Sequence, residues 1–259
     1  MDIKEFLEKR SKGERNFQNV QLGSVNLEGT DLSVIQFSGA NLSRATLSRA
    51  TLSRADLSYT NLTSVYLEQA YISQANLTGA NLTGSILNRA DFTITNLTGA
   101  NLTKCSLNRA DFTKANLSRT DLRGGKFEGC NFISSNLTFA NLSDVNLSSV
   151  NFINANLECA NLENANLNKA ILKNANLKKA DLRGANLINA NLEGANLTQA
   201  DLTNANIYGV NLQNVNLTDT IMPNGECYKP EDSTPDLSDP IDALSDTEKT
   251  MTRKIIKTE

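Results

Sequence analysis

The sequence predicts a repeat solenoid, a rod built from short units that stack on one another. Every fifth residue from Phe17 to Leu217 is Leu, Ile or Phe, which makes forty-one consecutive units without a change of frame. From Val20 onward, the residue two places before each of these is small or of modest size, and Asn or Asp mostly stands between the two. A period of five fits neither an α-helix nor an extended strand. A single unit cannot bury its own central Leu, so the units must stack and share one continuous core.

The residues within a unit resemble a known repeat family. Units such as Ala40-Asn41-Leu42-Ser43-Arg44 match the motif A(D/N)LXX of the pentapeptide-repeat proteins. This resemblance implies an all-β fold, a right-handed quadrilateral parallel β-helix (a pentapeptide-repeat solenoid) in which each unit forms one side and four units close a coil. It also implies that the central residue and the small residue point inward, while the other three positions face solvent.

The phenylalanines indicate the same coil of twenty residues. Seven central positions are Phe, and four of them are spaced by twenty: Phe92, Phe112, Phe132 and Phe152. In a coil of four units these rings stack in one ladder, where offset aromatic contacts are favourable. Phe17 and Phe37 make a second pair. We interpret all of these rings as core-filling residues, because the core of such a rod leaves no room for a ligand.

At the start of the chain, residues 1–15 are expected to form a short N-terminal capping helix. Asp2 and Glu5 have the spacing of a capping box. Apolar residues with helical spacing lie in the same segment: Ile3, Phe6 and Leu7. Their side of the helix would cover the exposed edge of the first coil. An amphipathic membrane anchor is the competing interpretation, but three apolar residues are too few for stable binding to a membrane surface.

Residues 16–222 are assigned to the β-helix, and residues 223–259 are expected to form an acidic tail. All four prolines of the chain lie in this tail, and a proline cannot donate to a β-ladder. Residues 226–243 contain few large apolar groups and are expected to be flexible. Ser245 and Glu248 have capping-box spacing, which favours a helix over residues 245–258, either docked on the last coil or in contact with a partner. A disordered tail is the alternative, and the sequence leaves this open.

Cysteine usage and the terminal sequence indicate the cytoplasm. No two of the four cysteines share a side of the rod at a spacing of twenty residues, so no disulfide framework is expected. The N-terminal residues lack the basic and apolar regions of a signal peptide, and no stretch approaches the length of a transmembrane span. We therefore expect a cytoplasmic protein that does not bind a membrane.

The composition argues against an enzyme. The chain has no His for acid–base catalysis, no metal-ligand spacing and no glycine-rich phosphate loop. Asp shares its place in the unit with Asn, which indicates backbone hydrogen bonding at the corners rather than a need for charge. A filled rod also has no concave pocket of ligand size. We expect no catalytic residue, no cofactor and no metal.

The charge of the repeat region bears on two nucleic-acid functions. Some members of the resembled family protect type II topoisomerases by mimicking DNA, which requires a strongly negative rod. Residues 16–222 contain fifteen Lys or Arg and fifteen Asp or Glu, and their net charge is therefore zero. The basic residues wrap around all sides instead of lining one, so direct binding to nucleic acid is not expected either.

The surface of the rod is therefore the feature that can carry a function. Residues at both ends of the repeat region also resemble cyanobacterial members of the family, among them a regulator of heterocyst differentiation that binds another protein. The sequence predicts a non-enzymatic protein–protein interaction scaffold, for which regulation is one role. The alternative is a DNA-mimic inhibitor or protector of a type II topoisomerase, and a third hypothesis is a purely structural role.

Large apolar residues at outward positions gather on one part of the unrolled rod. The side centred on Leu42 and Leu62 has none. The side of the Phe ladder and its neighbours carry the residues that we predict to contact a partner: Ile133, Ile153, Phe139, Ile94, Tyr71, Tyr66 and Ile86. Stacked β-branched residues also stabilise a sheet surface by themselves, but clustered Tyr, Phe and Ile are typical of interfaces. We expect a protein partner of unknown identity, or a second copy of this protein, at this surface.

Overall fold

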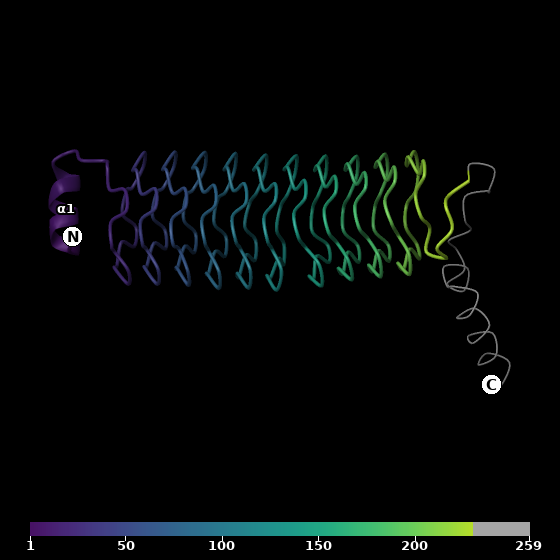
Figure 1. Ribbon diagram of the computed structural model, residues 1–259, viewed down its shortest axis with the longest axis horizontal. Helices are drawn as coiled ribbons and strands as arrows, with labels where there is room; N and C mark the ends of the chain where they lie inside the picture. Colours follow the sequence, from purple (N-terminus) through teal and green to yellow (C-terminus); the bar gives the residue numbers. More distant parts are fainter. Residues whose placement is uncertain (230–259) are drawn as a thin grey trace, which may run out of the picture.

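The computed structural model describes residues 1–229, which form a rod with one helix at its N-terminal end (Figure 1). This helix, α1, spans Ile3–Ser11. From Asn16 onward the chain winds in coils of twenty residues. The residue immediately before a central residue forms an isolated parallel β-bridge with the residue twenty places later. These bridges run from Asn16↔Gln36 to Asp201↔Ile221. The predicted coil of four five-residue units is thus confirmed.

The sides of the rod contain bridges rather than strands. Each unit contributes one bridge residue followed by a two-residue turn, so the described part of the chain contains no β-strand of its own. The expected sheets are therefore reduced to single parallel bridges between neighbouring coils, because the corner after every unit ends the pairing. The right-handed sense of the coil stays a prediction.

We name the four sides of the rod by their central residues. Side A is centred on Phe17 and every twentieth residue after it, and sides B, C and D are centred in the same way on Leu22, Leu27 and Leu32. The central residues and the small residues fill the interior, and nearly all of them are buried. The Phe ladder lies on side D, where neighbouring ring centroids are 4.9, 4.9 and 5.1 Å apart and the rings are nearly parallel. The predicted ladder is confirmed.

The Asn or Asp of a unit supports the turn that follows it. Its Oδ1 accepts a hydrogen bond from the backbone amide two residues later, as Asn41 does from Ser43 (3.1 Å) and Asp181 does from Arg183 (3.2 Å). A carboxylate and an amide serve this turn equally well, because both offer an oxygen acceptor at the same place. The interpretation of these Asp residues as backbone-bonding groups is confirmed.

The turn also imposes a left-handed backbone on one residue of every unit. The second residue after each central residue, from Asn19 to Asp219, has a φ between 54° and 69°. Gly and Asn tolerate this region, whereas β-branched residues rarely occupy it. Val34 and Ile94 occupy it nevertheless, with φ values of 55° and 59°. The fold thus holds these two residues in a backbone conformation that their side chains disfavour.

The N-terminal helix closes the first coil through one aromatic side chain. Asp2 accepts the backbone amide of Glu5 at 2.8 Å, and the ring of Phe6 is buried 4.6 Å from the ring of Phe17. Leu7 is 43% exposed, so the expectation that it also covers the coil is wrong. Phe6 and Leu7 are consecutive and point about 100° apart around the helix axis, so the helix buries only the one that reaches the ring of the first coil.

The C-terminal end of the described chain leaves the coil in a tight reversal. An antiparallel bridge joins Ile221 to Cys227, and the amide of Tyr228 donates to the carbonyl oxygen of Thr220 at 2.7 Å. The predicted tail helix at 245–258 lies outside the described residues. Within residues 1–229 the structure has no helix that is long and apolar enough to cross a membrane.

Candidate functional site

The predicted contact residues differ in how far they reach the solvent. Tyr71, Ile94 and Phe139 are 56%, 56% and 55% exposed, and Tyr66 is 44% exposed. The other three are half-buried: Ile86, Ile133 and Ile153. On side B, the described residues include no exposed large apolar side chain. Side B is thus free of exposed large apolar side chains, as predicted, but such side chains occur on sides A, C and D, and the accessible part of the predicted surface is smaller than the sequence indicated.

Four of these residues lie on the neighbouring sides C and D, in two successive coils. Tyr66 is bridged to Ile86 in the next coil on side C, and Tyr71 begins side D one unit after Tyr66. Ile94 ends side D in the same coil as Ile86. We call Tyr66, Tyr71, Ile86 and Ile94 the tyrosine patch. A groove of about 450 Å³ runs beside it on side C, lined by polar residues that include Arg49, Glu68 and Gln69.

Two further predicted residues form a second apolar strip on side D. Ile133 and Ile153 occupy the same position in successive coils, and the amide of Ser134 donates to the carbonyl oxygen of Ile153 at 2.9 Å. Ile171, which is 37% exposed, extends the strip into the following coil through its bridge to Asn151. We call Ile133, Ile153 and Ile171 the isoleucine strip.

Phe139 does not join either group. It lies on side A, and the guanidinium carbon of Arg119 in the preceding coil is 5.1 Å from its ring centroid. Tyr59 occupies the same position of side A and is the most exposed aromatic residue, at 69%, although the sequence analysis missed it. Its ring covers Gly79 in the next coil, where an added Cβ would lie 2.6 Å from Cε1. The spacing of twenty between Tyr59 and Gly79 was the available signal in the sequence.

The charged side chains of the rod are partly neutralised by local partners. On side B, Arg123 contacts Asp121 at 2.6 Å and Arg183 contacts Asp181 at 2.6 Å. The hydrogen bond from each arginine lowers the pKa of its aspartate below the ordinary range. Lys173 and Glu193 form a further pair between coils at 2.8 Å. Because these charges are neutralised by partners close by, they do not form a continuous basic or acidic stripe.

The potential metal ligands and thiols of the described residues are scattered or buried. No cluster of three potential metal ligands occurs within residues 1–229. The thiols of Cys105 and Cys130 are buried and donate to the carbonyl oxygens of Leu82 and Leu107 at 3.0 and 2.9 Å. Burial raises the pKa of each thiol to about 12, so neither is a thiolate near neutral pH. They fill the small-residue position and are not nucleophiles.

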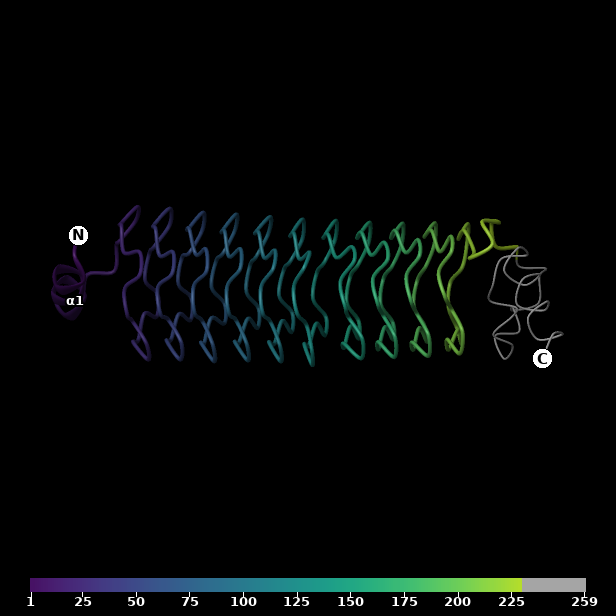
Figure 2. The same ribbon diagram turned by 90° about the horizontal axis from the view of Figure 1, so that it is seen from below.

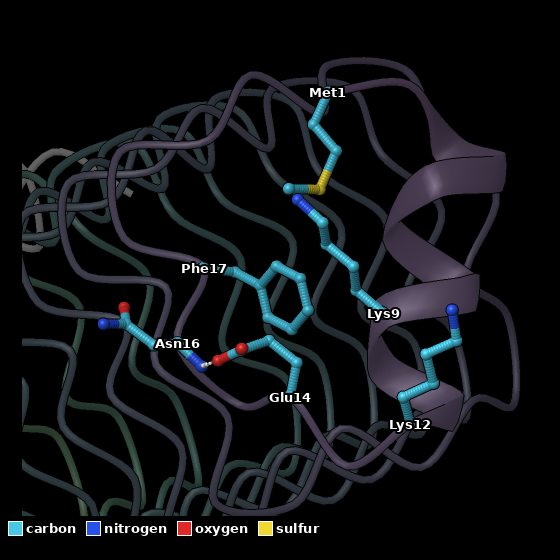
Figure 3. Close-up of a pocket in the computed structure, with 6 residues that line it drawn as sticks. All are labelled: Met1, Lys9, Lys12, Glu14, Asn16 and Phe17. Carbon is cyan, nitrogen blue, oxygen red and sulfur yellow. Dashed lines mark hydrogen bonds between the residues drawn. The ribbon is translucent and has the colours of Figure 1, made fainter.

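The groove between α1 and the first coil is small and polar. Figure 3 shows its lining, in which Glu14 accepts the backbone amide of Asn16 at 2.9 Å. Its volume is about 280 Å³, and Lys9 and Lys12 line it from the helix. Lys9 is paired with Glu5 and Lys12 with Glu8, at 2.8 and 2.7 Å. Both lysines are paired to carboxylates, and the carboxylate of Glu14 accepts the backbone amides of Arg15 and Asn16, so local contacts engage these side chains.

A second feature is an interruption of the bonding between two coils, on side C and at its corner with side B, which we call the ladder break. It lies between residues 124–129 and residues 143–148. Five amides in these two segments make no hydrogen bond to any described residue: those of Gly124, Phe127, Gly129, Val145 and Asn146. One coil earlier, the amides of Leu107 and Arg109 bond across the same side at 2.8 and 2.7 Å. In Figures 1 and 2 the coils near the middle of the rod stand further apart along one edge.

The ladder break has a cause in one unit of the sequence. Phe127 is a central residue on side C, where the corresponding residues of the neighbouring coils, Leu107 and Leu147, are smaller. Its ring folds back over Gly125, where an added Cβ would lie 2.6 Å from Cε2. Gly125 is only half-buried, whereas Cys105 at the same position one coil earlier is buried. The ring displaces the chain outward, and the coil can no longer reach its neighbour.

The residue after Gly125 also differs from the regular repeat unit. Lys126 stands where most units have Asn or Asp, so its side chain cannot accept the amide of Glu128, and Asn108 of the preceding coil accepts it at 3.1 Å. A groove of about 420 Å³ lies here and is lined by residues of three successive coils, from Asn108 to Ser148. The site is not predictable from the five-residue frame, because this frame continues through it without interruption. The signal was the Gly124-Gly125 pair, the one place in the chain where two glycines adjoin.

Comparisons with known proteins agree on one family. Residues 16–219 match the model described as pentapeptide repeats, in eight copies. Among solved structures the chain is similar to HetL, a pentapeptide-repeat protein of the cyanobacterium Nostoc sp. strain PCC 7120 involved in heterocyst differentiation regulation. The identity is 32% over 88% of this chain and 100% of that chain, with a TM-score of 0.34.

Two other solved structures are similar at lower identity. A trypsin-treated form of QnrB1, a plasmid-mediated fluoroquinolone resistance protein, is 19% identical over 77% of this chain and 87% of that chain, with a TM-score of 0.48. A pentapeptide-repeat protein from the thylakoid lumen of Arabidopsis thaliana is 27% identical over 43% of this chain and 68% of that chain, with a TM-score of 0.27. A search of curated proteins found no match.

Proposed function

The chain belongs to the pentapeptide-repeat family, and on that premise we propose that it is a non-enzymatic scaffold that binds a protein partner through the exposed apolar residues of its rod. The observation that carries this proposal is the tyrosine patch, in which Tyr66, Tyr71 and Ile94 are each more than two fifths exposed. Aromatic residues of this kind are enriched at protein interfaces and contribute much of their binding energy.

The left-handed backbone conformation of Ile94 supports a role of this side chain in binding a partner rather than in stabilising the fold. A β-branched residue in the left-handed region costs of the order of 1–2 kcal/mol relative to glycine. Ile94 has a φ of 59° there, and 56% of it is exposed, so the core gains little from its side chain. Neither local conformation nor burial favours isoleucine at this place, whereas contact with a partner would.

The proposed partner is not a DNA enzyme, such as a topoisomerase, that would bind the rod as a mimic of DNA. The repeat region has equal numbers of acidic and basic residues, and pairs such as Asp121–Arg123 offset its charges locally. No observation on the rod favours mimicry of a polyanion. HetL is described as involved in the regulation of heterocyst differentiation, and we propose a regulatory role of this kind for the chain. The four free cysteines support a reducing compartment, for which we propose the cytoplasm.

The proposal is tested with purified protein and a partner identified by pull-down from native lysate. Tyr71→Thr and Ile94→Gly should together weaken binding at least tenfold, measured by calorimetry. Thr51 stands at the position of Tyr71 one coil earlier, and Gly suits a left-handed residue, so the fold should tolerate both changes. The matched control is Arg44→Gly, a left-handed residue on side B. Equal losses for the patch and control variants would contradict the proposal, as would capture of topoisomerase subunits in a complex that these changes leave intact.

A further inference from the structure

We propose that the open edge of the last coil, residues 201–220, binds an acidic segment of this same chain, residues 231–244. The edge lies at the end of the rod opposite α1 (Figure 1). The segment would accept hydrogen bonds from backbone amides of the last coil that have no following coil to donate to. This surface is separate from the tyrosine patch, so the inference goes beyond the partner binding proposed above and does not depend on it.

The direction of the hydrogen bonds between coils gives the two ends of the rod opposite character. Two amides of a regular unit donate forward to the next coil. The amide of the central Leu187 donates to the carbonyl oxygen of Asn206 at 2.8 Å, and the amide of the left-handed Asn189 donates to that of Tyr208 at 2.9 Å. One amide per unit donates backward, as Asn206 does to Ala185 at 2.9 Å. A side without a following coil therefore exposes two donors and one acceptor, and a side without a preceding coil exposes the reverse.

The last coil shows this excess of donors on sides C, D and A. Six amides on these sides donate to no described residue: those of Ile207, Gly209, Leu212, Asn214, Leu217 and Asp219. Only three carbonyl oxygens on the same edge lack a described donor: those of Ala205, Val210 and Val215. Backbone amides need acceptors, and a carboxylate is the strongest acceptor that a side chain offers them. The edge therefore favours an acidic ligand over a basic one.

Apolar side chains lie beside the unpaired amides. Leu212 and Val215 are half-buried, whereas Leu192 and Ala195, at the same positions one coil earlier, are each 1% exposed. A groove of about 310 Å³ on side A is lined by Val215 and Tyr228 among others. A ligand of this edge should therefore carry apolar groups as well as carboxylates.

The sequence that follows the described residues has this composition. Residues 230–248 contain seven Asp or Glu and no Lys or Arg. Three apolar residues lie among the carboxylates: Leu237, Ile241 and Leu244. Prolines at 230, 235 and 240 have no backbone amide, so the segment brings few donors to an edge that already has too many. A segment that is too polar to form a core of its own can order against such a surface.

The chain's own segment is a better occupant than a second copy of the rod. Two copies joined by their last coils would place one donor-rich edge against another. A last coil joined to a first coil would be complementary, but α1 covers the first coil, with Phe6 packed 4.6 Å from Phe17. The segment is also tethered at the edge itself, where the amide of Tyr228 donates to the carbonyl oxygen of Thr220 at 2.7 Å. This tether gives it a high effective concentration.

Hydrogen exchange of the six edge amides, resolved by NMR, gives the test. We expect exchange in the full chain to be at least about tenfold slower than in a chain that ends at Lys229. The acid-free variant, in which three carboxylates are replaced, should exchange as fast as the shortened chain: it carries Asp236→Asn, Asp239→Asn and Asp242→Asn. The matched control removes three exposed carboxylates of the rod and should exchange as slowly as the full chain: it carries Glu68→Gln, Glu128→Gln and Asp144→Asn.

A pH titration of the same amide signals identifies the acceptor. An amide proton that is bonded to a carboxylate changes its chemical shift when the carboxylate loses its proton, near the ordinary pKa of about 4. Several of the six edge amides should show this shift in the full chain and in the matched control. The shift should be absent in the acid-free variant and in the shortened chain.

Three results would overturn the proposal. Equally fast exchange in the full and the shortened chain would leave water as the occupant of the edge. Slow exchange in the acid-free variant would show that the carboxylates are not what the edge binds. Slow exchange that appears only as the protein concentration rises, together with a doubled mass in light scattering, would make a second copy the occupant. None of these results bears on the tyrosine patch, which is tested by its own variants.

Discussion

The ring of Phe127 occupies the space that a Cβ atom at residue 125 would need, since an added Cβ on Gly125 would lie 2.6 Å from Cε2 of that ring. This pair couples a buried side chain to the backbone of its own unit. It also explains why the coil departs from its neighbour on side C, where the amides of Phe127 and Asn146 lack partners in the described chain.

The coupling predicts a non-additive effect on stability. Gly125→Ala alone should lower the free energy of unfolding by about 1–3 kcal/mol, because the methyl group and the ring cannot share the space. In a protein that also carries Phe127→Leu, the same change should cost much less or nothing. Urea unfolding of the wild type, the two single variants and the double variant gives the coupling directly. Additive effects would show that the ring can move aside without strain.

The Phe ladder predicts a second difference in stability. Phe132 is buried between two stacked rings, whose centroids lie 4.9 and 5.1 Å from its own. Phe132→Ala should cost about 3–5 kcal/mol, because the stacked coils cannot collapse into the cavity. The control Thr138→Ala changes an outward side chain and should cost less than about 0.5 kcal/mol. Equal shifts of the two urea transitions would mean that the inward and outward positions are wrongly assigned.

The N-terminal helix predicts a change in association. Removal of residues 1–12 takes away Phe6, whose ring packs 4.6 and 5.7 Å from those of Phe17 and Phe37. The truncated protein should self-associate through the uncovered first coil, with an unchanged circular dichroism spectrum of the rod. Light scattering measures the mass. A truncated protein that stays monomeric at high concentration would remove the capping role from α1.

The buried thiols predict a loss of stability at high pH. In the unfolded chain Cys105 and Cys130 ionise with an ordinary pKa of about 8.5, whereas burial raises the pKa of each to about 12 in the folded chain. The folded state therefore binds more protons than the unfolded state between these values, and the free energy of unfolding falls as the pH rises from about 8.5 toward 12. Below about 8.5 both states are protonated and the thiols add no pH dependence.

The contribution of the thiols is isolated by comparison with a variant. Cys105→Ala and Cys130→Ala together should make the decline between pH 8 and pH 10.5 shallower, since lysines and tyrosines contribute equally to both proteins. Urea midpoints at several pH values provide the measurement. Identical declines for the two proteins would show that the thiols ionise at similar pH in both states.

The repeat made the coil predictable, and its small departures were harder to see. An unbroken period of five specified the stacking, the buried columns and the turn role of Asn and Asp, because each follows from what one unit must bury and bond. The left-handed residue of every unit was not foreseen, although Gly79 and Gly84 mark it in the sequence. The absence of strands follows from the same turn, which ends the pairing after one bridge.

The candidate site was predicted only in part. Side B carries no exposed large apolar side chain among the described residues, and Tyr66 is paired with Ile86, as expected, but exposed apolar side chains occur on all three other sides. Phe139 was expected around the next corner from Ile133, and it lies there on side A, under the guanidinium of Arg119. The ladder break depends on how one ring packs against its own backbone, which no periodic pattern reveals. The packing of single residues such as Phe127 thus determines features of the surface that the repeat pattern does not predict.

The central claim is that a protein partner covers the corner between sides C and D. Hydroxyl-radical footprinting of the complex tests it most directly, because three exposed tyrosines lie on different parts of the rod: Tyr66 and Tyr71 at that corner and Tyr59 on side A, with 44%, 56% and 69% exposure. The account predicts that oxidation of Tyr66 and Tyr71 falls several-fold when the partner is bound, while oxidation of Tyr59 does not change. Protection of Tyr59 with Tyr66 and Tyr71 still fully reactive would contradict it.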